Sequence, residues 1–320
     1  MRAWIYEAYG GPEQLRLAEL PVPEPRENEL LVQVHAVSLN GSDKEGLTGF
    51  PAYARIGGFR RPRRQILGSD IAGVVEAVGA KVTRFKLGDR VFGDNLDRMG
   101  GFAEFARAGE RAMAPIPDGL GFEDAAALPQ GAMIALQGMR KARLRPGSTV
   151  LVNGAGGSAG SFAVQLARLG GAEITGVDNA GKADFVRSLG ADHFIDYARE
   201  DFWRAGKQYD VIFDVFARQK ASDYVRALKR GGSYFYVGGP VRRMLALLAA
   251  SPLTRLTTGR RIRLLMVRPN IRDLLEVADM VRAGVIRPAI GAVFPFDRVP
   301  DAMRALVEGT ALGKVVVRVV

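Results

Sequence analysis

The sequence feature that most constrains the fold is a short apolar run that ends in a glycine-rich turn and continues as an amphipathic helix. The run begins at Val150, the turn extends from Gly154 to Gly160, and the helical pattern continues to Gly170. This order places backbone N–H groups at a helix N-terminus, an arrangement that favours a pyrophosphate group. Within a βαβ unit, it predicts a dinucleotide site.

The turn supplies most of the predicted cofactor-binding residues. These are Gly154, Ala155, Gly156, Gly157, Ser158, Ala159 and Gly160. Asp178 follows about 20 positions later at the end of the next predicted strand, where a carboxylate can accept from ribose hydroxyls. The next residue, Asn179, is also a predicted cofactor-binding residue. The alternative is a glycine turn that only packs a helix and binds no ligand.

The residues after the turn give mixed signals about the nucleotide. Asp178 favours NAD(H), because its charge would repel a 2′-phosphate. Lys182 and Tyr197 could instead pair with or contact such a phosphate, unless both are ordinary surface residues. The choice between NADP(H) and NAD(H) stays open at this point.

Strand and helix patterns alternate in the second half of the chain, which predicts an α/β fold with a doubly wound parallel sheet. The expected strands are Thr149–Asn153, Glu173–Asp178, His193–Ile195, Val211–Asp214 and Ser233–Val237. The first third reads instead as short strands and turns, and the tail from Lys314 is strand-like. We expect one domain over residues 1–120, completed by 285–320, and a second over 121–284.

Composition excludes several kinds of chemistry. The chain has no cysteine, so it has no disulfide, no thiolate nucleophile and no Cys-ligated zinc. His35 and His193 lie far apart in sequence and are interpreted as structural residues. No apolar run has the length of a membrane span, and the first residues do not resemble a signal peptide. We expect a cytoplasmic protein with no metal and no membrane partner.

The chain is basic, with 45 lysine and arginine residues against 34 acidic ones and a net charge of +11. The basic residues are scattered and most are arginine, which favours a solvated surface. RNA binding is the less favoured alternative, so nucleic acid is an unlikely partner.

Several motifs together resemble the zinc-free quinone oxidoreductases of the medium-chain dehydrogenase/reductase superfamily, near its zeta-crystallin and enone reductase branches. Besides the glycine turn, they lie at residues 40–43, 66–75, 85–93, 125–129, 187–197, 231–232 and 238–239. The resemblance covers essentially the full chain. It implies a GroES-like β-rich catalytic lobe and a Rossmann lobe, with the cofactor in the cleft between them. It also favours NADP(H) slightly.

The resemblance bears directly on metal chemistry. Zinc alcohol dehydrogenases of this superfamily hold their catalytic metal with two cysteines and a histidine, and the matching positions here are Asn40, Ser69 and Gln130. Because these residues are not a credible zinc set, activation of an alcohol as a metal alkoxide is not expected. Hydride transfer from NAD(P)H to a quinone or an α,β-unsaturated carbonyl needs less assistance.

Four residues are candidates for catalysis by resemblance. Asn40 and Asp43 would lie near the nicotinamide ribose, although Asn-Gly and Ser-Asp also favour simple turns. Lys44 could polarise a carbonyl oxygen, but enone reductases carry their lysine one place later, where this chain has Glu45. Tyr53 is the nearest match to the tyrosines of quinone reductases. No side chain stands out as a general acid, so we expect the proton to come from solvent.

The remaining cofactor candidates also come from the resemblance. Gly238 and Gly239 should pass close to the nicotinamide, unless they only form a strand-end turn. Gln130 and Ile134 are also predicted to bind the cofactor. Ile134 replaces the threonine that the family places near the carboxamide. Ser158 and Ala159 stand where Gly-Val is usual in the family.

An edge strand at Ile262–Val267 would pair with its twin and form a homodimer. The segment Val241–Gly259 either caps the substrate pocket or packs as a helix without a functional role. Two alternatives to a quinone or enone reductase stay open. One is a metal-free NAD(P)-dependent alcohol dehydrogenase, and the other is a dinucleotide-binding regulatory or structural protein with little turnover.

Overall fold

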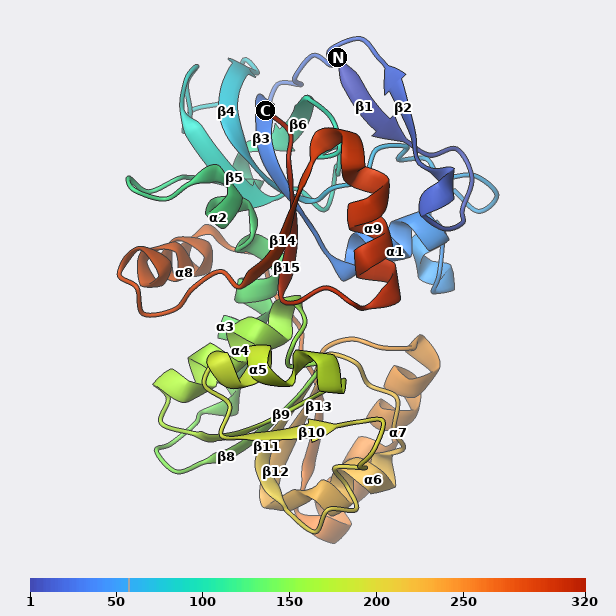
Figure 1. Cartoon of the computed structure of the whole chain (residues 1–320), viewed down its shortest axis with the longest axis vertical. Helices are drawn as coiled ribbons and strands as arrows, with labels where there is room; N and C mark the ends of the chain where they lie inside the picture. The colour runs from blue at the N-terminus through green and yellow to red at the C-terminus, as the bar shows by residue number, and fades with distance from the viewer. Residues whose placement is uncertain (57) are drawn as a thin grey trace. The chain divides into compact units, whose positions relative to one another are not determined.

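A computed structural model describes residues 1–56 and 58–320 of the chain. The chain forms two compact units (Figure 1). Unit 1 consists of Met1–Gln130 together with Pro269–Val320, and unit 2 consists of Gly131–Arg268. Both ends of the chain therefore build one unit, and its middle builds the other.

Unit 1 is built on a mostly antiparallel sheet with strand order β14-β15-β3-β4-β5-β7, in which β6 also pairs with β3. Its strands are β3 (Glu29–Leu39), β4 (Asp70–Val78), β5 (Arg90–Asp94), β6 (Phe105–Gly109), β7 (Met113–Pro115), β14 (Ile290–Pro295) and β15 (Lys314–Arg318). A separate antiparallel pair is formed by β1 (Arg2–Ile5) and β2 (Arg16–Glu19). Alternating valine and leucine side chains of β3 and β15 supply much of the buried core.

Four α-helices accompany this sheet: α1 (Gly41–Thr48), α2 (Phe122–Ala126), α8 (Ile271–Arg282) and α9 (Val299–Glu308). Helix α2 packs against β3 and β4, and α8 packs against β7. These contacts place residues 121–130 and 269–284 in unit 1, whereas the sequence assigned them to the other domain. Periodicity alone does not show which sheet a helix covers.

Unit 2 contains a six-stranded parallel sheet in the order β10-β9-β8-β11-β12-β13. Its strands are β8 (Thr149–Asn153), β9 (Glu173–Asp178), β10 (His193–Asp196), β11 (Tyr209–Asp214), β12 (Leu228–Tyr236) and β13 (Arg261–Leu264). Its helices are α3 (Pro129–Ala142), which begins at the unit boundary, α4 (Ser158–Leu169), α5 (Ala183–Ser188), α6 (Ala221–Ala227) and α7 (Val241–Thr258). Contacts place α4 and α5 on one face of the sheet and α6 and α7 on the other. The predicted doubly wound sheet is confirmed.

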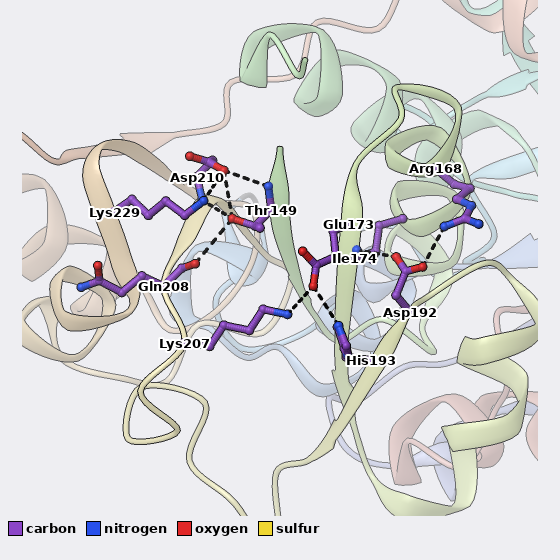
Figure 2. Close-up of polar contacts among 10 residues, drawn as sticks. All are labelled: Thr149, Arg168, Glu173, Ile174, Asp192, His193, Lys207, Gln208, Asp210 and Lys229. Atoms are coloured by element: carbon purple, nitrogen blue, oxygen red, sulfur yellow. Dashed lines mark hydrogen bonds and ion pairs between the residues drawn. The ribbon is translucent and has the colours of Figure 1, made fainter. Parts of the chain in front are cut away.

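The amino ends of the unit 2 strands carry a polar network (Figure 2). Glu173 of β9 accepts from Lys207 at 2.8 Å and lies 2.8 Å from the His193 ring of β10. Both partners lower the pKa of the Glu173 carboxyl. Asp210 of β11 accepts from the backbone N–H of Thr149 at 2.8 Å. His193 thus lies in a network at the end of the sheet opposite the glycine turn, consistent with a structural role.

No helix within residues 1–56 and 58–320 combines the length and apolar character needed to cross a bilayer.

Candidate functional site

The glycine turn connects the carboxyl end of β8 to α4. Gly154 has φ +83°, a conformation that favours glycine. A Cβ on Gly160 would lie 2.0 Å from the Gly154 carbonyl oxygen, so only glycine lets the helix approach the turn this closely. By contrast, a Cβ on Gly157 would meet its nearest atom at 3.4 Å, an ordinary contact.

The structure divides the amides of the turn into two groups. The N–H groups of Gly154 and Ala155 donate to the Val177 carbonyl, and that of Gly157 donates to Gly154. The Gly156 N–H donates to Asp178 Oδ2 at 2.8 Å. The amides from Gly154 to Gly157 therefore hold the turn together. Those of Ser158, Ala159 and Gly160, in the first turn of α4, have no intrahelical acceptor.

Ser158 provides a direct test of whether this turn suits a dinucleotide. Its hydroxyl oxygen is buried and has no hydrogen-bond partner. Leaving such a group unpaired costs about 1–3 kcal/mol. An anionic oxygen at the N-terminus of α4 would accept from this hydroxyl and from the open amides, and the helix dipole would favour its charge. The turn therefore fits a pyrophosphate group.

Asp178 at the end of β9 is more enclosed than the sequence suggested. Its side chain is 9% exposed, and its Oδ1 accepts from the Asn179 backbone N–H at 2.9 Å. The Lys182 ammonium lies 3.8 Å from Oδ1 and is equally buried. In the structure this carboxylate holds the turn and neutralises Lys182, in addition to lying where a ribose is expected. Tyr197 is 60% exposed, and its backbone N–H donates a hydrogen bond to the Asp178 carbonyl.

Asp214, at the end of β11, forms hydrogen bonds at the same edge of the sheet. It is fully buried and accepts from Asn153 Nδ2 at 2.7 Å and from the Tyr234 hydroxyl at 2.9 Å. Burial raises the pKa of the Asp214 carboxyl. The Gly238 carbonyl accepts from the Ala217 N–H at 2.9 Å, which joins the loops that follow β11 and β12. Gly238 and Gly239 thus lie at the carboxyl edge, as the sequence predicted.

Unit 1 carries a second group of polar residues, which we call the polar cluster: Ser42, Asn40, Asp43, Ser69, Asp70, Asp94, Gln130 and Lys314. The three zinc-matching positions are joined by hydrogen bonds here. Gln130 Nε2 donates to Ser69 Oγ at 3.0 Å, and Asn40 Nδ2 lies 3.4 Å from the same oxygen. Amide and hydroxyl groups bound to one another are a poor zinc donor set. Within the described residues, no group of three or more His, Asp or Glu side chains could hold a metal ion.

A buried ion pair lies beneath these residues. Lys314 Nζ donates to Asn40 Oδ1 at 2.8 Å and to Asp70 Oδ2 at 3.3 Å, and neither charged side chain is exposed. The second oxygen of Asp70, Oδ1, is buried without a partner. Burial raises the pKa of the Asp70 carboxyl, and the Lys314 charge opposes that shift. Asp94 faces the same group, and burial together with the Asp70 charge raises its pKa to about 7.

The candidate catalytic residues occupy different environments. Asp43 is fully buried, and its carboxylate accepts from the N–H groups of Asn40 and Gly68, both at 2.8 Å. Burial raises its pKa to about 7. With no exposed surface, Asp43 positions the start of α1 and the Gly68 turn. Its expected place near the nicotinamide ribose stays a prediction.

Lys44 also has a structural partner, since its ammonium donates to the Val307 carbonyl in the last turn of α9 at 3.1 Å. A cation is favourable at that helix end. The structure thus gives Lys44 a helix-capping contact, and its role on a substrate carbonyl stays a prediction. Tyr53 is 45% exposed and hydrogen-bonds the Glu45 carboxyl. Ile134 of α3 is half-buried.

Sequence reasoning missed Asp70, Asp94, Asp214 and Lys314. Each is an ionisable residue at one end of a strand whose interior is mainly apolar, and that was the available signal. Lys314 opens a run of three valines, and Asp214 closes β11. A charge that ends a buried strand must be paired or neutralised, so such positions mark polar networks.

The two units together define a class of protein: a β-rich unit carrying a buried polar cluster, and a doubly wound unit carrying a dinucleotide turn. Two family models match the chain. A GroES-like domain of alcohol dehydrogenases covers residues 26–118, and a zinc-binding dehydrogenase model covers residues 189–317. The zinc-matching positions nevertheless hold Asn40, Ser69 and Gln130.

Curated relatives extend over nearly the whole chain. A 2-methylene-furan-3-one reductase from Solanum lycopersicum is 32% identical over 99% of this chain and 79% of its own length. An NADPH-dependent alkenal/one oxidoreductase from Arabidopsis thaliana is 33% identical with the same coverage. The solved quinone oxidoreductase from Coxiella burnetii superposes with a TM-score of 0.89 at 28% identity, over 100% of this chain and 99% of its own.

The chain belongs to the quinone and enone oxidoreductase branch of the medium-chain dehydrogenase/reductase superfamily. The resemblance drawn from its motifs is confirmed, and so are the GroES-like and Rossmann fold classes.

Proposed function

We propose that this protein is an NADPH-dependent reductase of quinones or α,β-unsaturated carbonyls. The observation that carries the proposal is the buried, unpaired Ser158 hydroxyl beside the open amides of α4. In a member of this branch, that group is suited to the diphosphate of a nicotinamide nucleotide. NADPH is preferred over NADH because a relative of 33% identity is named for it.

The proposal gives the residues of unit 2 distinct tasks. When bound, the nucleotide supplies a hydride. Ser158 and the first amides of α4 hold its diphosphate, and Lys182 and Tyr197 lie toward the adenosine ribose. Gly238 and Gly239 would lie beside the nicotinamide. The packing of the neighbouring loop requires glycine at both positions, because a Cβ would lie 2.8 Å from the Val215 oxygen or 2.7 Å from the Ala217 oxygen.

Unit 1 binds the substrate in this proposal. The half-buried members of the polar cluster, Ser42, Gln130 and Asp94, present polar atoms to it, while Asn40 and Asp43 fix their positions. Tyr53 is exposed enough to touch a substrate. Because amides and hydroxyls replace a zinc set, the acceptor must already be electrophilic, as a quinone or an enone is. We assign this task to unit 1, residues 1–130 with 269–320, and cofactor binding to unit 2, residues 131–268.

The reaction is tested by following absorbance of the reduced nicotinamide with NADPH or NADH and a panel of quinones, enones and alcohols. Turnover of quinones or enones supports the proposal. Oxidation of alcohols alone would favour a metal-free alcohol dehydrogenase. Nucleotide binding by fluorescence, with no turnover of any acceptor, would favour a dinucleotide-binding regulatory or structural protein.

Nucleotide preference is tested at Asp178. Asp178→Ser removes the charge that would oppose a 2′-phosphate and frees Lys182, so the ratio of kcat/KM for NADPH to that for NADH should rise about tenfold or more. Asp178→Asn is the matched variant, because it keeps an oxygen for the Gly156 N–H and loses only the charge. An unchanged ratio in both variants would show that Asp178 does not lie near the 2′ position.

We also propose a homodimer through the β13 edge, within residues 262–267. In unit 2, β13 is the terminal strand of the sheet, so its outer edge can accept a twin strand. The cytoplasm is the proposed place of action, and fluorescence imaging of the tagged full chain tests it.

A further inference from the structure

One face of helix α7 is apolar and exposed. Leu247 points inward and is 1% exposed among Tyr234 and Ile262. The opposite face, which we call the α7 face, consists of Leu245, Leu248, Ala249, Leu253 and Leu256. Leu245 is 58% exposed, Leu253 66% and Leu256 83%. Their spacing places them on one side of the helix. Single exposed leucines are ordinary, whereas a contiguous row marks an interaction surface.

All the charged residues in the sequence around this face are cationic. From Tyr224 to Arg272 there is no aspartate or glutamate. The same stretch contains ten arginines and one lysine, among them Arg242 and Arg243 at the start of α7. A partner for this face must therefore supply negative charge of its own.

Three of these arginines, Arg255, Arg261 and Arg263, lie on α7 and the adjoining strand β13 and interact with one another and with Arg143. We call these four residues the arginine cluster. Burial and repulsion from the other three lower the pKa of Arg263. In the part of the chain that the structure describes, no ion pair joins this cluster to a carboxylate. Arg255 is on α7 itself, and Arg261 and Arg263 are on the adjoining strand β13. Unneutralised arginines thus border the exposed leucines.

We propose that the α7 face and the arginine cluster dock on an anionic lipid surface. Leucines that enter the headgroup boundary and arginines that pair with phosphates are the two components of interfacial membrane binding. The proposed β13 dimer would bring a second arginine cluster, so a second copy of this chain leaves these arginines without negative charge. A nucleic acid would satisfy the arginines but leave the leucines in water.

The earlier expectation of no membrane partner followed from the lack of a span-length apolar run. An interfacial helix needs only one apolar face, so the two statements concern different features. Docking does not depend on the proposed reaction. If that reaction also holds, docking would bring the enzyme to acceptors dissolved in the bilayer.

The test is co-sedimentation of the full chain with phosphatidylcholine vesicles, with and without phosphatidylglycerol. Binding is expected only to the anionic vesicles and should weaken with added salt. Leu253→Ser with Leu256→Ser should lower the affinity about tenfold or more. Arg255→Gln with Arg261→Gln should lower it about tenfold or more as well.

Matched controls are Leu169→Ser and Arg204→Gln. Leu169 is 51% exposed at the end of α4, and the Arg204 side chain is 73% exposed and paired with Asp201. Both should bind like the wild type. Unfolding midpoints show that all variants fold, and vesicle binding is scored without any substrate.

Three outcomes would overturn the inference. One is the absence of binding to anionic vesicles. Another is weakened self-association of the leucine variants in sedimentation velocity, with vesicle binding unchanged, since the α7 face would then lie between copies. The third is vesicle binding that depends on the arginines but not on the leucines, which would indicate a general polyanion site.

Discussion

At the scale of single residues, the charge on Lys314 is the least replaceable one in unit 1. It is fully buried, and it balances Asp70 and holds the Asn40 amide. Asp70 keeps one oxygen without a partner, so its pairing with Lys314 compensates only part of its burial. Burial of one charge without the other leaves an uncompensated ion in a low dielectric.

Lys314→Met should therefore destabilise the protein by about 3–5 kcal/mol, as measured by urea unfolding. Adding Asp70→Asn should restore part of that loss, because the orphaned charge disappears. Lys81→Met is the matched control, since Lys81 forms an ion pair with Glu27 whose side chains are 62% and 65% exposed. Its cost should stay below about 1 kcal/mol. Equal losses for the buried and the exposed pair would contradict this account.

Asp94 gives the stability of unit 1 a pH dependence. Its pKa is about 7 in the folded chain against an ordinary value of 3.8. The unfolded chain therefore releases this proton first as the pH rises. The contribution of Asp94 is complete below pH ~4, declines up to pH ~7 and is lost above it. Asp94→Asn should flatten that decline, which is worth about 1.4 kcal/mol per unit of pKa shift.

The measurement is the free energy of unfolding at several pH values between ~4 and ~8. Asp97→Asn, an exposed change in the same loop, should leave the wild-type profile intact. An Asp94→Asn profile that follows the wild type would show that the Asp94 proton does not contribute. The other buried carboxyls with raised pKa values, Asp43, Asp70 and Asp214, would then account for the decline.

At the scale of elements, the turn between β8 and α4 depends on one close approach. Gly160→Ala would place a Cβ 2.0 Å from the Gly154 oxygen, so the turn or the helix must shift. We expect a loss of about 1–3 kcal/mol in stability, together with weaker nucleotide binding. Gly157→Ala, with a nearest contact of 3.4 Å, should keep wild-type stability. Calorimetric unfolding compares the two, and equal losses would place the constraint elsewhere.

The sequence predicted the strands of unit 2 well because they are buried on both faces. Two of these strands, β8 and β9, coincide with their predicted bounds. Continuous apolar runs bounded by glycine or aspartate leave little freedom in where such strands begin and end. Strand β13 is shorter than expected and ends at Leu264.

The polar cluster could not be predicted from the sequence in the same way. Its members lie on α1, β4, β5, α3 and β15 or directly before α1 and β4. The pairing of β15 with β3 and of β3 with β4 brings them together. No local pattern encodes a register between strands so distant in sequence. Asn40, Ser69 and Gln130 were found because they match the zinc-ligand positions of the zinc alcohol dehydrogenases of the superfamily. Lys314 and Asp94 match no such position.

At the scale of the whole molecule, the proposed dimer must form despite its charge. The β13 edge carries Arg261 and Arg263, both exposed, so a twin strand would bring like charges together. The backbone ladder favours the dimer and the arginines oppose it. Added salt should therefore strengthen association until the arginines are screened.

Sedimentation velocity at low and moderate salt checks this expectation. Arg261→Gln with Arg263→Gln should raise the dimer fraction at low salt and reduce its dependence on salt. Arg204→Gln, on an exposed loop of the same unit, should change neither. A wild-type dimer that dissociates as salt is added would point to an interface held by attraction between opposite charges.

The division of unit 1 between the two flanks of unit 2 affects how the chain folds during translation. Asp70 leaves the ribosome 244 residues before Lys314, its only partner of opposite charge among the described residues. The early segment must therefore wait, with an incomplete sheet, while the contiguous middle of the chain is synthesised. The arrival of β15 completes the pairing with β3 and delivers the missing cation.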